Sequence, residues 1–254
     1  MSVHINEKAD NLFLVNLENE KLNVLDTNFL NEITDTFMEL KSNNDCHGVT
    51  LTGNGNCFSA GINLKKVFTS GDHYLFEFMD ALDLCFRTLF EFPKPVIGAI
   101  NGHALAGGCI IAACCDYKIA VKNEKAKIGI TELAVGVPFP SVPLEIMRFI
   151  LPPKYMQEVF YFAKGYSFLI AQKYGLVDEL TSAENLIDFS LKYAKNLARI
   201  PNETFSRTKA HLREDTVKKY TADKAKKYDL ALRDYWASEE QKNVIEKFLN
   251  SLKK

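Results

Sequence analysis

Segments patterned like strands and segments patterned like helices alternate along the sequence from Asn11 to about Asp178. Short apolar or alternating runs predict strands at residues 11–17, 48–52, 96–100, 117–121 and 127–130. Apolar residues that recur every three or four positions predict helices at about 29–40, 74–92 and 107–115. Asp26 or Thr27 is the expected N-cap of the first helix. Such alternation is typical of an α/β domain.

Beyond Asp178 the chain is patterned as helices only. One helix repeats its buried-face residues at helical spacing and ends before Pro201: Leu186, Ser190, Tyr193 and Leu197. The segment Ser238-Glu239-Glu240-Gln241 matches a capping box, which predicts the start of the last helix. No linker rich in Pro, Gly or Ser precedes these helices. We therefore expect a core that carries the functional site in residues 1–195. Residues 196–254 are expected to form a helical cap or an oligomer surface rather than an independent domain.

The composition excludes several classes of function. The formal net charge is -1, so no overall field favours nucleic acid or an anionic membrane surface. The longest apolar stretches, Val96–Ile100 and Ile110–Cys115, are too short to span a bilayer, and the first residues lack the pattern of a secretory signal. The 6 cysteines form no CxxC pair and the 5 histidines are scattered, so no metal site is expected. We expect a reduced, soluble, cytoplasmic protein that binds neither nucleic acid nor membranes.

Two loops of small residues, Cys57–Leu64 and Asn101–Cys109, each join a predicted strand to a predicted helix. The first N–H groups of a helix have no partner within it and carry the positive end of the helix dipole. Glycine and alanine also let a ligand approach the backbone, so each loop is a candidate anion site. Either loop alone is more simply a glycine-rich turn. The two loops are followed by the segments Ile128–Leu133 and Val135–Pro138. Together, these four segments predict one shared site.

These loops and several further segments carry a resemblance to a known family. The segments are Phe58-Ser59-Ala60-Gly61, Pro93 to Gly102, Ala106-Gly107-Gly108-Cys109, Cys115-Asp116-Tyr117, Glu132 and Tyr174 to Asp178. In this order and spacing, nearly the whole chain resembles the enoyl-CoA hydratase/isomerase (crotonase) family. The resemblance implies a spiral of ββα units with a C-terminal helical region that trimerises, often as a dimer of trimers. It also implies an acyl-CoA thioester substrate, with coenzyme A as part of that substrate and no separate cofactor.

By this resemblance, the N–H groups of Ala60 and Gly107 form an oxyanion hole for the thioester oxygen, and Glu132 transfers the proton. The implied substrate-binding residues lie in both loops, after Glu132 and on the last helix: Ser59, Gly61, Ile62, Asn63, Leu64, Lys65, Gly108, Ile110, Pro138 and Phe248. Lys65 or Lys66 would meet a CoA phosphate, although most lysines only solvate a helix face. The last helix is expected to help close the CoA site.

The reaction that the resemblance implies depends on the position directly after Cys109. Hydratases of the family use two glutamates, and one of them stands at this position, whereas this sequence has Ile110 there. An isoleucine neither activates water nor exchanges protons. We therefore expect Glu132 to act alone in a dry pocket, where burial raises its pKa. A single carboxylate suits a 1,3-proton shift, and segment 106–112 is most similar to the monofunctional Δ3,Δ2-enoyl-CoA isomerases. The predicted reaction converts 3-enoyl-CoA to 2-trans-enoyl-CoA.

Two alternatives stay open at this point. An enoyl-CoA hydratase would need a second acid outside the family's usual position, and the candidates are Glu77, Asp80 and Asp83 on the preceding helix. A protein that binds acyl-CoA without catalysis would need no acid at all. The product formed from a 3-enoyl-CoA, with and without the Glu132 carboxyl group, separates these possibilities.

Overall fold

The computed structural model describes residues 2–251 and confirms the predicted α/β class. A six-stranded sheet has the order β1 (Val3–Lys8), β2 (Leu12–Leu17), β4 (Gly48–Gly53), β7 (Val96–Ile100), β9 (Tyr117–Val121), β12 (Glu179–Thr181). Its neighbours are parallel except β1 and β2, which form an antiparallel hairpin. A four-stranded sheet has the order β11 (Tyr166–Ser167), β10 (Lys127–Gly129), β8 (His103–Leu105), β5 (Cys57–Ser59). Strands β3 (Val24–Leu25) and β6 (Gly61–Ile62) form a parallel pair.

The chain builds these sheets by repeating one unit of two strands and a helical segment. Strands β4, β7 and β9 of the large sheet are followed by β5, β8 and β10 of the small sheet, and each small-sheet strand leads to a helical segment. This is the spiral of ββα units that the resemblance implies. Because β5, β8 and β10 are parallel neighbours, the loops that leave their C-terminal ends lie along one edge of the small sheet.

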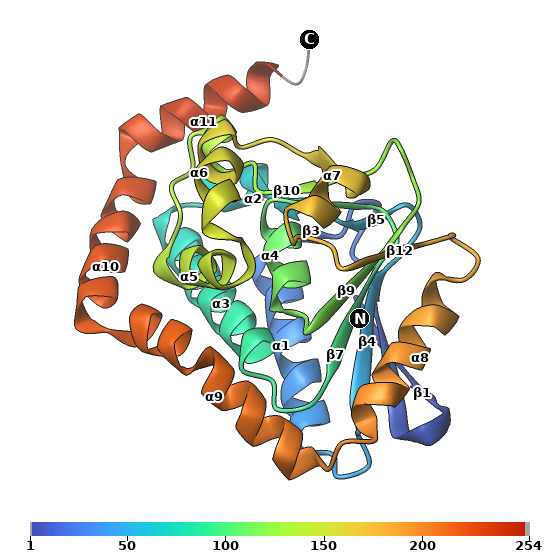
Figure 1. Ribbon diagram of the computed structural model, residues 1–254. Helices are drawn as coiled ribbons and strands as arrows, with labels where there is room; N and C mark the ends of the chain where they lie inside the picture. Colours follow the sequence, from blue (N-terminus) through green and yellow to red (C-terminus); the bar gives the residue numbers. More distant parts are fainter. Residues whose placement is uncertain (1, 252–254) are drawn as a thin grey trace.

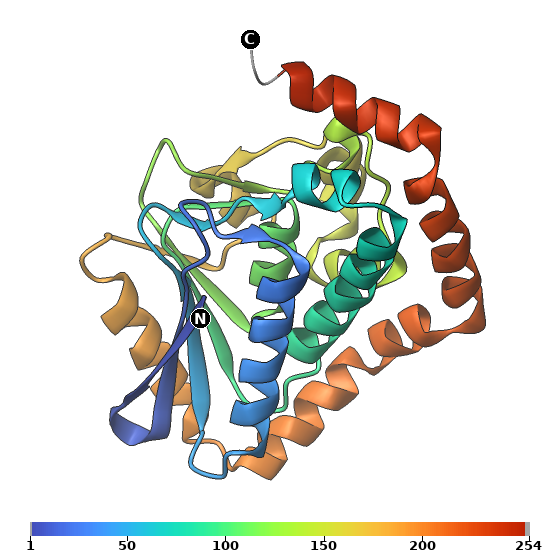
Figure 2. The ribbon, with the colours of Figure 1, turned by 180° about the vertical axis from the view of Figure 1, so that it is seen from behind.

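Helices cover both faces of the six-stranded sheet. The helices α1 (Thr27–Ser42) and α3 (Asp72–Phe90) lie on one side of it, and α8 (Leu186–Ala198) lies on the other (Figures 1 and 2). The Asp26 side chain accepts a hydrogen bond from the Phe29 N–H at 2.9 Å, which confirms Asp26 as the N-cap of α1. The short helix α4 (Gly107–Cys114) is buried along its whole length, as its run of small and apolar residues predicts.

The C-terminal helices wrap around the outside of the helical layer. In Figure 1 the helices α9 (Asn202–Thr221), α10 (Asp223–Ala237) and α11 (Glu239–Ser251) follow one another from the bottom of the molecule to the top. They pack on α3, α5 (Ser141–Ile150), α2 (Leu64–Thr69) and the 3₁₀ turn η2 (Leu133–Val135). Two buried basic side chains fasten α9, because Lys209 and Arg213 pair with the half-buried Asp116 at 2.7 Å and 2.9 Å. The region is thus joined to the core by packing and by charge.

The remaining elements are η1 (Ala9–Asn11), α6 (Pro153–Phe162) and α7 (Phe168–Lys173). Strand β1 was not predicted, because only Val3 of its six residues is buried and the sequence therefore shows no alternation.

The predicted capping box at α11 forms only in part. The Ser238 hydroxyl accepts from the Gln241 N–H at 3.2 Å, but the Gln241 side chain donates to the Gly136 carbonyl at 2.9 Å instead of returning to Ser238. Within residues 2–251, the helices are all too short or too polar to cross a membrane.

Candidate active site

The first loop takes its shape from a residue that lies more than thirty positions earlier in the chain. Asn23 is buried with a φ of 49°, and its side chain donates to the carbonyls of Cys57 and Phe58, each at 3.1 Å. The Ser59 hydroxyl donates to the Asn23 carbonyl at 2.7 Å and accepts from the Gly61 N–H at 3.1 Å. These bonds hold the end of β5 so that the chain turns at Gly61, whose φ is 86°, and pairs with β3.

The prediction that the Ala60 N–H is free to bind the thioester oxygen is wrong. This N–H donates to the Leu22 carbonyl at 2.9 Å. The Asn63 N–H donates to the Leu25 carbonyl at 2.9 Å and so fixes the phase of the pairing between β6 and β3. Successive N–H groups of a strand point to opposite sides, so the N–H of Ile62 points away from β3. Ile62 also lines the cavity that contains Glu132, which makes it the better candidate for the first donor.

The second loop brings the N-terminus of α4 against the first. Ala106 has a φ of 50° and donates its N–H to the Gly129 carbonyl at 2.9 Å, which ties this loop to the end of β10. Gly107 is the first residue of α4, where an N–H has no partner within the helix. A Cβ atom at Gly61 would lie 2.8 Å from the Leu105 carbonyl oxygen and 3.1 Å from the Gly107 nitrogen, so only glycine lets the loops approach this closely.

Glu132 follows β10 at the same edge of the sheet. Its carbonyl accepts from the N–H groups of Val135 and Val137 at 3.1 Å and 2.9 Å, and Gly136 closes the turn with a φ of 77°. The residue is 7% exposed, and its Oε2 atom has no hydrogen-bond partner among residues 2–251. Burial raises the pKa of Glu132 from its ordinary value of 4.5 to about 7, while the N–H groups of Glu132 and Thr131 oppose that rise only in part.

Glu132 lies between two cavities. The wider one measures about 150 Å³, and its walls include residues of the first loop, of the segment around Glu132 and of the last helix: Ala60, Ile62, Leu64, Thr131, Val135 and Phe248. The narrow one measures about 10 Å³, and its walls are almost entirely apolar: Phe86, Gly107, Ile110, Val137, Pro138 and Trp236 among them. Among the described residues, Glu132 is the single acidic side chain in either wall. Ile110 thus faces the same narrow space as Glu132.

Several predicted substrate-binding residues lie behind these walls instead. Ser59 is fully buried, and Gly108 lies against it, because a Cβ atom at Gly108 would be 2.3 Å from the Ser59 carbonyl oxygen. Asn63 caps α2 by accepting from the Lys66 N–H at 3.1 Å. These residues, like Gly61, shape the loops rather than line the cavities. Lys65 lies outside both walls too, on the surface.

The two lysines of α2 differ in their surroundings. The Lys66 ammonium group pairs with Asp26 at 2.7 Å, and this partner raises the pKa of Lys66. Lys65 is exposed, and the described part of the chain offers it no ion pair. A phosphate group would have to compete with Asp26 for Lys66, so Lys65 is the better candidate for a CoA phosphate.

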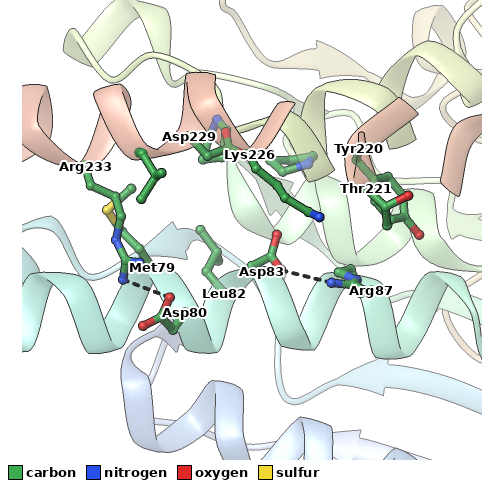
Figure 3. A pocket seen from close by; sticks show the side chains of 13 residues that line it. Met79, Asp80, Leu82, Asp83, Arg87, Tyr220, Thr221, Lys226, Asp229 and Arg233 are labelled. Carbon is green, nitrogen blue, oxygen red and sulfur yellow. Dashed lines mark ion pairs between the residues drawn. The ribbon is translucent and has the colours of Figure 1, made fainter. Parts of the chain in front are cut away.

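The acids that a hydratase might use lie elsewhere. Asp80 pairs with Arg233 at 2.8 Å and Asp83 pairs with Arg87 at 3.7 Å, on the side of α3 that faces α10 (Figure 3). Glu77 faces His73 at 3.5 Å on the exposed surface of α3. None of these acids lines either cavity next to Glu132.

Sequence reasoning missed three residues that build the site. Trp236 lines the narrow cavity, and the only signal for it was its place among apolar residues of a late helix. Gln241 is fully buried and binds the turn after Glu132 through Gly136, a role that its match to a capping box concealed. Asn23 holds the first loop from a distance, and no local pattern marks it.

Comparison with known proteins shows which proteins this chain resembles. Residues 7–254 match the family model described as enoyl-CoA hydratase/isomerase. The mouse protein named enoyl-CoA delta isomerase 1, mitochondrial, is 26% identical over 204 residues, which cover 80% of this chain and 71% of that protein. A probable mitochondrial enoyl-CoA hydratase of Dictyostelium discoideum is 30% identical over 207 residues, covering 80% of this chain and 72% of that one.

Solved structures show the same fold. The human mitochondrial Δ3-Δ2-enoyl-CoA isomerase superposes with a TM-score of 0.94 at 22% identity, covering 100% of this chain and 98% of that one. A probable enoyl-CoA hydratase of Mycobacterium tuberculosis superposes with a TM-score of 0.83 at 24% identity, covering 93% of this chain and 100% of that one. Relatives named as isomerases and relatives named as hydratases both match, so the choice between the two reactions depends on the residues of the site.

Proposed function

Because this chain belongs to the enoyl-CoA hydratase/isomerase family, we propose that it is an enoyl-CoA isomerase that moves a double bond from a 3-enoyl-CoA to the conjugated 2-trans position. One observation carries this choice: Glu132 is the only acid in the described walls of its two cavities, and Ile110 stands where a second acid would serve a hydratase. Adding water requires one group to orient the water and another to transfer a proton. A 1,3-proton shift requires one group that takes a proton and returns it.

The backbone would supply the electrostatic part of the reaction. The thioester oxygen would accept from the N–H groups of Ile62 and Gly107, which come from the two loops that meet at Gly61. When a proton leaves C2, negative charge moves onto this oxygen and the two donors stabilise it. Removing one such donor typically costs about 3 kcal/mol of transition-state stabilisation. The positive end of the buried helix α4 acts in the same direction.

The side chain of Glu132 would carry the proton. Its carboxylate takes the proton from C2 of the 3-enoyl group, the electrons of the broken C–H bond form the enolate, and the protonated acid then delivers the proton to C4. Collapse of the enolate leaves the double bond between C2 and C3. A base with a pKa of about 7 is half ionised at neutral pH, so it can both accept and release the proton there. Its unpartnered Oε2 atom is free to face the substrate.

The wide cavity suits the thioester end of the substrate. Leu64 and Phe248 offer apolar contacts for the pantetheine chain, and Phe248 comes from α11, which closes over the site. The exposed ammonium group of Lys65 stands on the adjoining helix, at the end where the phosphates of coenzyme A would leave the protein. The protein would therefore take coenzyme A as part of its substrate and use no separate cofactor.

A direct test uses trans-3-hexenoyl-CoA and the absorbance of the conjugated thioester. The wild type should form 2-trans-hexenoyl-CoA, and Glu132→Gln should lower kcat by at least a thousandfold while it still binds the substrate. Glu145→Gln is the control, because Glu145 is also a buried glutamate (8% exposed) with an unpartnered Oε2 atom, but it pairs with Arg148 through Oε1 and lines neither cavity. If the wild type is inactive and still binds coenzyme A esters, the protein is a binder rather than an isomerase.

Hydration remains the second candidate, because a relative named as a hydratase is 30% identical to this chain. Crotonyl-CoA tests it, since water addition removes the conjugated absorbance. Hydration of crotonyl-CoA at a rate that exceeds isomerisation of 3-hexenoyl-CoA would overturn the proposed function.

A further inference from the structure

A third cavity lies between α3 and the junction of α9 and α10, where side chains from both sides face each other across it (Figure 3). It measures about 410 Å³, more than twice the cavity beside Glu132. Its deepest walls are apolar, because Met79 and Leu82 are 8% and 4% exposed and Pro143 is buried as well. These buried apolar side chains can contact a hydrocarbon group.

Four of the charged residues that line this cavity form two ion pairs. Arg233 pairs with Asp80 at 2.8 Å, and the two side chains are 27% and 70% exposed. Arg87 pairs with Asp83 at 3.7 Å, and these side chains are 41% and 43% exposed. Because each arginine already faces an aspartate, neither pair needs an anionic ligand. The cavity thus combines these two ion pairs with an apolar inner wall formed by Met79, Leu82 and Pro143, here called the apolar floor.

The three cavities adjoin one another in a row. Leu82, Pro140 and Pro143 line both the 410 Å³ cavity and the narrow one of about 10 Å³. Ile62, Glu132 and Val137 line both the narrow cavity and the one of about 150 Å³. The narrow cavity, here called the neck, therefore separates the cavity under α11 from the one between α3 and α10, and Glu132 lies in its wall.

Trp236 is a wall residue of the neck whose ring is not fixed by a hydrogen bond within the described residues. The neck measures about 10 Å³. Such a space holds roughly one water molecule, so an alkyl chain passes only when a wall residue shifts. Trp236 is fully buried, and within residues 2–251 its indole N–H has no hydrogen-bond partner. Its ring lies 5.8 Å from that of Phe68 in a tilted contact. Rotation of the ring would thus break no hydrogen bond.

We propose that the acyl chain of the substrate continues through this neck and that its distal end lies in the 410 Å³ cavity. The protein then prefers 3-enoyl-CoA esters with chains longer than six carbons. This inference rests on the proposed function, which places the thioester at Ile62 and Gly107 and the double bond at Glu132. The hydrocarbon covers the apolar floor, while the two ion pairs, which are partly exposed, stay in contact with water. Each buried methylene tightens binding by roughly fourfold, which corresponds to about 0.8 kcal/mol.

The test measures binding, so that it does not depend on catalysis. The Kd values of hexanoyl-, octanoyl-, decanoyl- and dodecanoyl-CoA are measured by calorimetry on the full-length protein. We expect the Kd of decanoyl-CoA to be at least tenfold lower than that of hexanoyl-CoA. Equal Kd values for all four esters would overturn the proposal.

A pair of matched variants locates the distal end of the chain. Leu230 lines the 410 Å³ cavity and is 62% exposed, so Leu230→Trp adds bulk there without disturbing the core. Leu212→Trp is the control, because Leu212 is 69% exposed on α9 and lines none of the three cavities. We expect Leu230→Trp to weaken decanoyl-CoA binding at least threefold and to leave hexanoyl-CoA binding unchanged, and Leu212→Trp to change neither. An equal loss for both esters, or in both variants, would refute the assignment.

These outcomes separate the inference from the function on which it rests. Isomerisation of 3-hexenoyl-CoA combined with equal Kd values for all chain lengths would refute the acyl path and leave the proposed function intact. Chain-length-dependent binding that Leu230→Trp abolishes, in a protein that isomerises nothing, would refute the proposed function and retain the path.

Discussion

Replacing Glu132 by glutamine should remove activity and at the same time change how stability depends on pH. Burial raises the pKa of Glu132 to about 7, whereas an unfolded chain would restore the ordinary value of 4.5. Between these values the folded protein holds a proton that the unfolded chain has released. Stability that is fully present below pH 4.5 is therefore lost as the pH rises through about 7. The whole loss amounts to about 3 kcal/mol.

The assay compares urea unfolding of the wild type, Glu132→Gln and Glu145→Gln at pH 5, 6, 7 and 8. Protein concentration is kept fixed, since any oligomer would couple stability to concentration. A glutamine has no proton to lose, so its free energy of unfolding lacks this pH-dependent loss. The difference in the free energy of unfolding, Glu132→Gln minus wild type, should therefore increase by about 2.5 kcal/mol between pH 5 and pH 8. Contributions from all other groups cancel in the comparison. A difference that stays constant across the four pH values would refute the reasoning.

The same pKa should govern catalysis. The ionised carboxylate is the base, so kcat/KM for 3-hexenoyl-CoA should rise with pH, with an inflection near 7, and level off above about pH 8. Activity at pH 6 should be about a tenth of its plateau. If the pH of this inflection agrees with the pH at which the loss of stability ends, both effects can be assigned to the carboxyl group of Glu132. An inflection near 4.5 would mean that the carboxylate is hydrated in the working enzyme.

Three further substitutions test other parts of the site. Ile110→Glu brings a second carboxylate into the narrow cavity, and repulsion between the two acids should move the inflection of kcat/KM to higher pH by more than one unit, as a pH profile would show. Gly108→Ala places a methyl group 2.3 Å from the Ser59 carbonyl oxygen, so the two loops must separate and kcat should fall by roughly a hundredfold or more, with the circular dichroism spectrum unchanged. Gln241→Leu removes the donor to the Gly136 carbonyl. Losing this hydrogen bond should lower the free energy of unfolding by about 1.5 kcal/mol and, because the turn after Glu132 loosens, raise KM for 3-hexenoyl-CoA. Removal of residues 238–254 should raise KM further, and an unchanged KM would show that α11 does not close the site.

The sequence predicted those elements whose burial leaves a periodic pattern. The strands β7 and β9 match their predicted bounds, because each is a run of apolar residues between turn signals. Strand β1 left no such pattern, since its side chains are mostly exposed and its place depends on hydrogen bonds with β2. Local sequence cannot encode that partner.

The functional site, too, was predicted only where local sequence carries the signal. Glycines and a glutamate at known spacing identified both loops and the acid, but they did not say which N–H groups are free. That depends on the phase of the β3–β6 pairing and on the positive φ of Gly61, both of which involve residues from before α1. The correction from Ala60 to Ile62 follows from this long-range pairing. Trp236 and Gln241 reach the site from the other end of the chain, where no motif marks them.

The narrow cavity relates the length of the substrate's acyl chain to the choice between isomerisation and hydration. It has room for about one water molecule, and two residues in its wall carry buried polar atoms without partners among the described residues, Glu132 Oε2 and Trp236 Nε1. A long alkyl chain would fill the neck as far as Trp236 and exclude water from both atoms, whereas the four-carbon chain of crotonyl-CoA would end beside Glu132 and leave the space near Trp236 open. Residual hydration should therefore be faster for crotonyl-CoA than for 2-decenoyl-CoA by at least tenfold. Trp236→Phe keeps an aromatic ring and removes the donor, so it should slow crotonyl-CoA hydration and leave isomerisation of 3-decenoyl-CoA within twofold. Equal hydration of both esters would mean that water reaches Glu132 by another route, and that the acyl chain does not dry the site.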